Sequence, residues 1–145
     1  MKIFLLIFVL CILISCTENI PFPSGKLQGN LSDTPGDWTE IAAARVIQLE
    51  TKPSDPYSVK LWIIGFDDRL YVHAGTNRTQ WVQNMRANPD VRLLIGDSLF
   101  ELTSIRVVAQ SEFDEFAEVY ESKYGDRPRN ENISEAYLFR LSPRF

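Results

Sequence analysis

The residues best suited to chemistry stand together, between the end of one predicted strand and the start of a predicted helix. The segment from His73 to Thr79 holds the single histidine of the chain, a glycine, two hydroxyls and a guanidinium. Amides at a helix start lack partners and lie at the positive end of the dipole, so such a turn can hold an anion such as phosphate. Arg78 could bind it in a bidentate manner, and Gly75 would let it approach the backbone.

Each of these residues also has an ordinary structural interpretation. Arg78 would then be a solvated loop residue, Thr79 a helix cap, and Asn77 a turn residue that tolerates positive φ. His73 at a strand end suits a proton donor or a cofactor contact near neutral pH, but a histidine can also simply pack there. Both interpretations stay open on the sequence alone.

Hydrophobic periodicity predicts the elements that must position this turn. The apolar segments 59–66 and 70–74 indicate two strands of a hairpin that turns at residues 67–68. Thr79 would cap a helix over 80–87, which ends at Asn88 because that residue precedes Pro89. Further strands are expected at 46–51, 91–95, 99–108 and 137–141, and helices at 41–45 and 112–124, the latter capped by Gly125. This order favours one small α+β barrel.

The stretch from Leu70 to Val91 resembles one family, the flavin- and deazaflavin-binding split β-barrels, which include pyridoxamine-phosphate oxidase and the deazaflavin-dependent nitroreductases. Residues at the family's intervals are Trp81, Asn84, Ala87, Asn88, Pro89 and Val91, and the segment 137–143 looks like the closing strand. The resemblance covers residues 38 to 145. It implies an α+β split β-barrel of about six mostly antiparallel strands with two or three short helices, an FMN or deazaflavin cofactor, and a homodimer.

The resemblance also implies a set of cofactor contacts. They are Lys60, His73, Gly75, Thr76, Asn77, Arg78, Thr79 and Trp81. Trp81 stands where the oxidases carry a lysine and is instead the residue of the deazaflavin group, but the loop 52–60 lacks the glycines of that group. Trp62 and Trp81 could stack on a flavin ring, although core packing also suits them.

Two functions are consistent with these observations. The first is a membrane-anchored oxidoreductase that binds a flavin-type cofactor and reduces a small oxidised substrate, with His73 as a weak catalytic candidate. The second is a non-catalytic binding or scaffold lipoprotein with a degenerate cofactor site. The family resemblance favours the first function, and the departures from the family pattern favour the second. The sequence therefore leaves both open.

The N-terminus has the pattern of an exported lipoprotein. Lys2 precedes an apolar run over 3–14, too short for the roughly 20 residues that span a bilayer. The residues Leu13-Ile14-Ser15-Cys16 resemble the bacterial lipobox. We expect a signal peptide over 1–15, a lipidated Cys16 and flexible tether over 16–37, and the barrel domain over 38–145. The anchor would hold the domain in a bacterial cell envelope, at an outer membrane or periplasmic face in a two-membrane cell. An ordinary signal peptide or an uncleaved anchor is the alternative.

Composition limits the partners. Without residues 1–15 the chain has 14 basic and 19 acidic residues, a balance that opposes binding to nucleic acid. Cleavage would remove Cys11 and lipid would block Cys16, so no disulfide is expected. With a single histidine, the sequence predicts no transition-metal site either.

Overall fold

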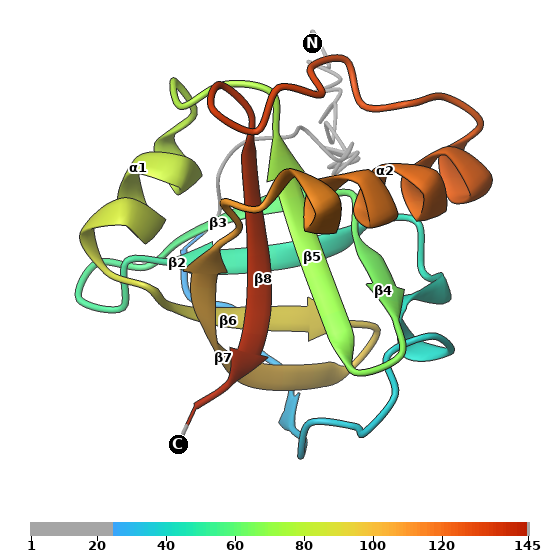
Figure 1. Cartoon of the computed structure of the whole chain (residues 1–145). Coiled ribbons are helices and arrows are strands. Elements are labelled where there is room, and N and C mark those ends of the chain that lie inside the picture. Colours follow the sequence, from blue (N-terminus) through green and yellow to red (C-terminus); the bar gives the residue numbers. More distant parts are fainter. Residues whose placement is uncertain (1–24, 145) are drawn as a thin grey trace, which may run out of the picture.

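The computed structural model describes residues 25–144, so the predicted signal peptide and Cys16 lie outside the described part. One curled sheet forms the body of the molecule, with two α-helices packed against it (Figure 1). The strands are β1 (Asn30–Leu31), β2 (Ile47–Thr51), β3 (Tyr57–Leu61), β4 (Ile64–Phe66), β5 (Arg69–Ala74), β6 (Asp90–Ile95), β7 (Ser98–Arg106) and β8 (Tyr137–Pro143). The helices are η1 (Ile41–Ala43, a short 3-10 turn), α1 (Gln80–Ala87) and α2 (Gln110–Tyr124).

The sheet has the order β3-β2-β6-β7-β8-β5-β4, and these neighbours are antiparallel. Within the described part of the chain, β1 adds the one parallel pairing, along β7. The predicted α+β split β-barrel is therefore confirmed. The described residues form eight strands instead of about six, because β1 was not expected and the segment 59–66 divides into two strands.

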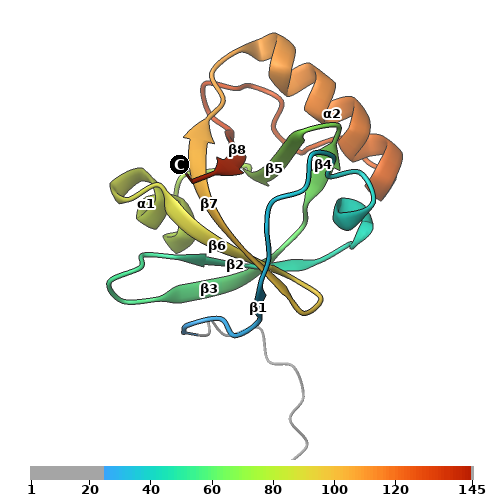
Figure 2. The same cartoon turned by 90° about the horizontal axis from the view of Figure 1, so that it is seen from below.

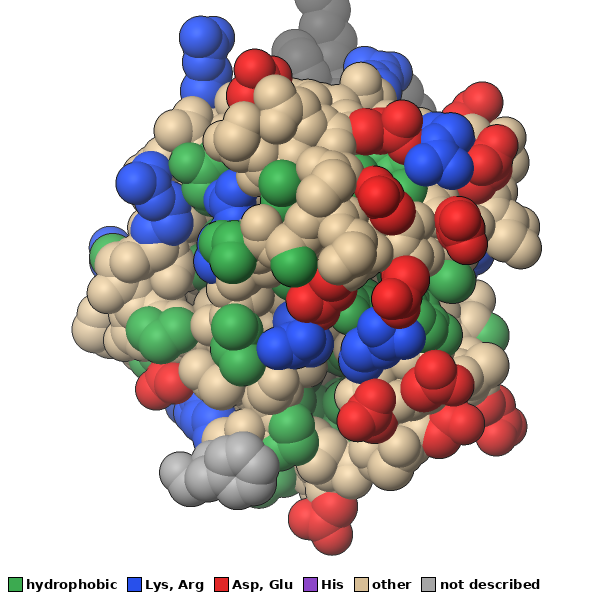
Figure 3. Space-filling view, viewed as in Figure 1, with side chains coloured by type: hydrophobic (Ala, Val, Ile, Leu, Met, Phe, Trp, Pro, Cys, Tyr) green, Lys and Arg blue, Asp and Glu red, His purple; other side chains and the backbone are tan. Residues whose placement is uncertain are grey.

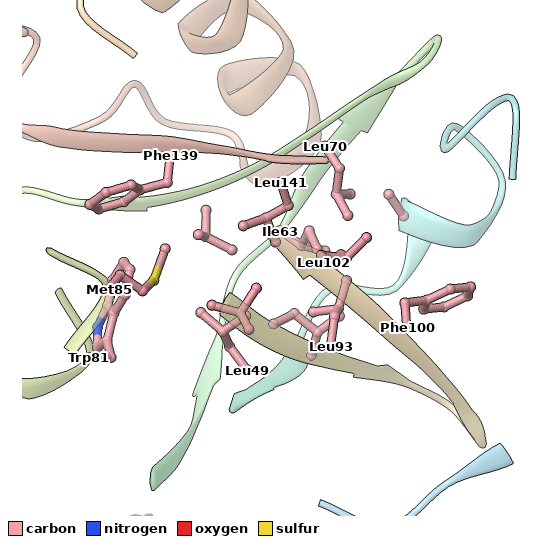
Figure 4. Close-up of a cluster of buried hydrophobic side chains, with 14 of the residues drawn as sticks. Leu49, Ile63, Leu70, Trp81, Met85, Leu93, Phe100, Leu102, Phe139 and Leu141 are labelled. Carbon is pink, nitrogen blue, oxygen red and sulfur yellow. The ribbon is translucent and has the colours of Figure 1, made fainter. Parts of the chain in front are cut away.

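Alternation along the strands gives the barrel an inner and an outer face. On β5, the side chains of Leu70, Val72 and Ala74 belong to the barrel core, whereas Tyr71 packs in a second cluster under α2. His73, two residues further, faces the same side as Tyr71 because strand side chains alternate. Figure 4 shows the inward-facing residues of several strands meeting in the barrel core.

The two α-helices close different parts of the barrel. Trp81, Val82 and Met85 of α1 are buried against the core at one side. The second helix, α2, covers the outer face of β4, β5 and β8, opposite β2 and β3 (Figure 2). It ends at Gly125, whose φ of 89° is the left-handed conformation that the sequence predicts there. Neither helix, nor any other within 25–144, is long and apolar enough to cross a bilayer.

The chain leaves one strand and enters the next at Trp62 and Ile63, where the sequence predicts a continuous strand. The backbone N–H of Ile63 donates to the Tyr124 hydroxyl (3.1 Å), and its carbonyl accepts from the Lys123 ammonium (2.8 Å). Lys123 also donates to the carbonyls of Ala42 and Ala44, both at 2.6 Å. The end of α2 thus takes over hydrogen bonds that a strand would have made, and this permits the break.

The segment from residue 25 onward lies on the barrel, whereas the sequence predicts a flexible tether over 16–37. Leu27 is 5% exposed, and its N–H donates to the Glu50 carboxylate (2.6 Å) while its carbonyl accepts from Arg92 (3.2 Å). Glu50 and Arg92 face each other across β2 and β6 and form a buried two-bond ion pair at 2.8 and 2.6 Å. Within the described residues, the part that packs on the barrel therefore includes Leu27, which lies before the domain boundary predicted at residue 38.

Candidate functional site

Two residues of the predicted site, Lys60 and His73, meet at a cavity of about 450 Å³, here called the β5 cavity. Its walls include Lys60 of β3, Trp62 after β3, Tyr71 and His73 of β5, and Phe116 and Tyr120 of α2. Ligand sites are typically apolar clefts of about 300–1,000 Å³ with a few polar groups. The β5 cavity has this character, with one imidazole and one ammonium among aromatic rings.

His73 is held among rings of α2. Its ring centroid lies 5.9 Å from that of Phe113, 5.5 Å from that of Phe116 and 6.3 Å from that of Tyr120. Burial disfavours the charged imidazolium and lowers the pKa of His73 from 6.5 to about 4. The imidazole is therefore neutral at pH 7. A neutral imidazole keeps one donor and one acceptor nitrogen, so His73 can contact a ligand, and its pKa lies below the near-neutral range that the sequence suggested.

The predicted anion-binding turn is at the surface. Gly75, Thr76, Asn77 and Arg78 are all exposed, between the end of β5 and the start of α1. The Arg78 N–H donates to the Thr76 hydroxyl (3.3 Å), while its guanidinium forms no ion pair within residues 25–144. The cation of the turn is thus available to an external anion.

Thr79 starts α1 with an extended backbone, as expected of an N-cap, but its hydroxyl makes no capping hydrogen bond. That oxygen is buried and has no partner. Two other side-chain atoms in the described chain share this condition, His73 Nε2 and Ser104 Oγ. A buried polar atom without a hydrogen bond is costly, and a bound molecule or water would relieve it. Two of the three atoms belong to residues predicted for the site.

The tryptophans divide between core and surface. Trp81 is 5% exposed and packs in the barrel core, with its ring centroid 6.3 Å from that of Phe139. Trp62 is 51% exposed and stacks on Tyr124, at 4.3 Å between centroids and 11° between planes. An aromatic surface is therefore present at Trp62, whereas the indole of Trp81 is enclosed.

Sequence reasoning missed the contribution of α2 to this site. Phe116 and Tyr120 line the β5 cavity, and the spacing of four residues places them on one face of the helix. Their periodicity predicted an amphipathic helix, but nothing local indicated which strand it covers. No group of three or more His, Cys, Asp or Glu that could hold a metal ion occurs within residues 25–144.

Comparison with known proteins gives matches in structure only. No family model and no curated protein sequence matches the chain. Among solved structures, a provisionally assigned pyridoxamine 5'-phosphate oxidase from Listeria innocua is similar, with a TM-score of 0.56 and 16% identity over 72% of this chain and 88% of that chain.

Two further similar structures are those of proteins named for a ligand. A FAD-binding protein from Mesorhizobium loti has a TM-score of 0.53 and 22% identity over 72% of this chain and 85% of that one. The heme storage protein HutZ from Vibrio cholerae has a TM-score of 0.55 and 18% identity over 73% and 87%. At these identities the likeness concerns the fold alone, and by that fold the chain is a split β-barrel.

Proposed function

We propose that the domain binds a flavin-type cofactor at the β5 cavity and acts as an oxidoreductase on a small oxidised substrate, anchored to a membrane through Cys16. The observation that carries the proposal is a cavity with aromatic walls that is lined by both Lys60 and His73, whose buried Nε2 has no hydrogen-bond partner. The similarity in fold to a FAD-binding protein supports it. A bound flavin would supply the hydride or electron chemistry, and the protein would supply orientation and shielding.

The residues of the cavity fit a flat heteroaromatic ring. Tyr120 and Trp62 offer aromatic surface, their centroids lying 5.9 Å apart at the wall. His73 Nε2 would bond to a polar ring edge, because the neutral imidazole is a donor or an acceptor according to its tautomer. The Lys60 ammonium would stabilise negative charge on the reduced ring.

The turn after β5 would hold a phosphate of the same molecule. Gly75 follows His73 by two residues, which is about 7 Å along an extended strand. A mononucleotide whose ring occupies the β5 cavity would thus bring its phosphate toward Thr76 and Arg78. The buried hydroxyl of Thr79 lies at the start of α1, where the free backbone amides of the helix would also attract an anion.

A second copy of the chain would complete the enclosure. Trp62 and Val46 at the cavity wall are 51% and 50% exposed, so one side of the cavity has apolar surface open to solvent. Covering this surface in a homodimer would bury it and exclude water from the ring. The oligomeric state therefore belongs to the same proposal.

Titration of the purified soluble part of the chain, from Thr17 onward, with FMN tests the proposal. We expect binding accompanied by a shift of the visible spectrum. Arg78→Ala should weaken it by about 1.5 to 3 kcal/mol, the usual value of a charge-assisted hydrogen bond. Lys26→Ala is the matched control, since that lysine is also an exposed cation but lines neither the β5 cavity nor the turn after β5. The FMN affinity of this control variant should equal that of the wild type.

The same titration distinguishes the alternatives. A colourless protein whose FMN dissociation constant is no lower than about 1 mM, a binding free energy of roughly −4 kcal/mol, would contradict the oxidoreductase proposal. A binding or scaffold lipoprotein would then be the remaining function. A deazaflavin coenzyme and haem are titrated in parallel. If haem binds and neither flavin nor deazaflavin does, the cofactor of the proposal would be haem instead of a flavin.

A further inference from the structure

A larger cavity, of about 690 Å³, lies at the end of the barrel beside α1 and is here called the α1 cavity. It is lined by the inward-facing residues at the end of β7 and the start of β8, together with two residues of α1. Those central to the argument are Met85, Arg86, Ser104, Arg106, Tyr137 and Phe139. None of its lining residues belongs to the site predicted from the sequence or to the β5 cavity.

The floor of the α1 cavity is apolar and aromatic. Met85 and Phe139 are each 3% exposed and belong to the barrel core (Figure 4). Tyr137 lies beside Phe139 with its ring centroid 6.2 Å away. At the mouth, Val108 is 78% exposed. An apolar ligand body would find contact surface here.

One wall carries a guanidinium in a fixed orientation. Arg106 stacks on Tyr137, with 3.7 Å between its Cζ atom and the ring centroid. Its Nη2 donates to the carbonyls of Ile133 (2.9 Å) and Ala136 (2.6 Å). Carbonyls do not neutralise its charge, and within residues 25–144 no carboxylate pairs with it. Because the side chain is already held, binding an anion would cost little conformational entropy.

A second guanidinium lies at the same cavity. The Cζ atom of Arg86 is 5.8 Å from the Tyr137 ring centroid, and this side chain also forms no ion pair within the described range. The chain as a whole has more acidic than basic residues, 19 against 15. Acidic side chains gather mainly on the side of α2, and basic ones stand among apolar side chains on the side of α1 (Figure 3). The α1 cavity is therefore locally positive in an acidic protein.

A polar atom without a partner completes the site. Ser104 is 8% exposed, lines the cavity, and its Oγ has no hydrogen bond. Inward-facing apolar residues precede it on β7, with Leu102 and Phe100 at the alternate positions. A hydroxyl in such a position lowers stability unless something binds to it. This is a second, independent indication of a ligand.

From this arrangement we infer that the α1 cavity binds a small organic anion, consisting of an apolar, ring-bearing body and one carboxylate or sulfonate. The body would lie against Met85, Tyr137 and Phe139. The anionic group would contact Arg86 and Arg106, and Ser104 would donate to an oxygen of the ligand. The inference does not depend on a flavin, because it uses none of the residues assigned to that cofactor.

Two fluorescent probes that differ mainly in charge test the inference on the purified chain from Thr17 onward. Anilinonaphthalene sulfonate carries an anion on an aromatic body, and N-phenylnaphthylamine is its neutral analogue. Arg86→Gln should weaken the sulfonate probe roughly tenfold, as loss of one charged contact predicts, and should leave the neutral probe unchanged. Ser104→Ala should also weaken the sulfonate probe without lowering the unfolding temperature, because the free protein loses only an unpaired hydroxyl.

The controls separate this cavity from other surfaces. Arg129→Gln removes an exposed arginine that does not line the cavity and should leave the sulfonate affinity unchanged. Val108→Glu places a negative charge at the mouth and should weaken the sulfonate probe more than the neutral one. Two results would overturn the inference. One is an equal loss of affinity for both probes in Arg86→Gln, and the other is an unchanged affinity for the sulfonate probe in both Arg86→Gln and Val108→Glu. Failure of FMN to bind would not affect it.

Discussion

A histidine surrounded by Phe113, Phe116 and Tyr120 resists protonation, and this makes stability depend on pH. The pKa of His73 is about 4 in the folded protein against 6.5 for the free group. Below pH 6.5 the unfolded chain therefore binds a proton that the folded protein does not. The contribution of His73 to stability is complete above pH 6.5 and is lost as the pH falls to 4.

The expected loss between pH 6.5 and pH 4 is about 3 kcal/mol at most, from 1.36 kcal/mol per unit of pKa difference. Carboxylates titrate in the same range, so the wild type is compared with His73→Gln, which has no imidazole. Urea unfolding at a series of pH values measures both proteins. Parallel stability curves for the two proteins would show that His73 is not buried in its neutral form.

The sequence could predict which face of β5 carries His73, but not its environment. Apolar residues at Leu70, Val72 and Ala74 assign the inner face, so His73 had to lie on the outer one. Its burial comes from α2, about forty residues later in the chain. Long-range packing of this kind leaves no local signal, so the expected pKa near neutrality could not be corrected from sequence.

At the scale of elements, the ion pair of Glu50 and Arg92 joins β2 to β6 and holds the segment around Leu27. The Glu50 side chain is 5% exposed and that of Arg92 16%. Removing one partner leaves a poorly hydrated charge, so Glu50→Gln should lower the free energy of unfolding by about 3 kcal/mol, at the lower end of the range for buried pairs.

Chemical denaturation measures this loss, and amide exchange at Leu27 should accelerate in the same variant. Glu115→Gln is the matched control: its carboxylate pairs with Arg69 at 2.7 Å but is 56% exposed. Exposed pairs contribute about 0–1 kcal/mol. Equal effects of the two substitutions would argue that the Glu50 pair adds nothing by being buried.

Most elements were predictable because their signals are local. The helix α1 ends at Ala87 because the next residue, Asn88, precedes a proline. The hairpin of β6 and β7 turns at Gly96, which has a φ of 57°. The break at Ile63 was not predictable, since hydrogen bonds from Lys123 and Tyr124 determine it. For the same reason β1 was missed, because a two-residue strand depends on its partner β7 and not on its own pattern.

At the scale of the whole molecule, attachment to a membrane rests on Cys16, and cell fractionation tests it. Cys16→Ala should move the protein from the membrane fraction to the aqueous fraction, because the acyl chains would have no attachment point. Cys11→Ala is the matched control, since the predicted cleavage removes that residue, and it should stay with the membrane. Retention of both variants in the membrane would contradict the lipobox.

The three tryptophans of the chain differ sharply in access to solvent. Trp38 is 1% and Trp81 5% exposed, whereas Trp62 is 51% exposed at the wall of the β5 cavity. A collisional quencher such as iodide therefore reaches one indole and leaves the emission of the other two nearly intact. The molecule carries its own spectroscopic reporter: occupancy of that cavity, or contact with a second copy across Trp62, registers as protection from iodide without any attached label.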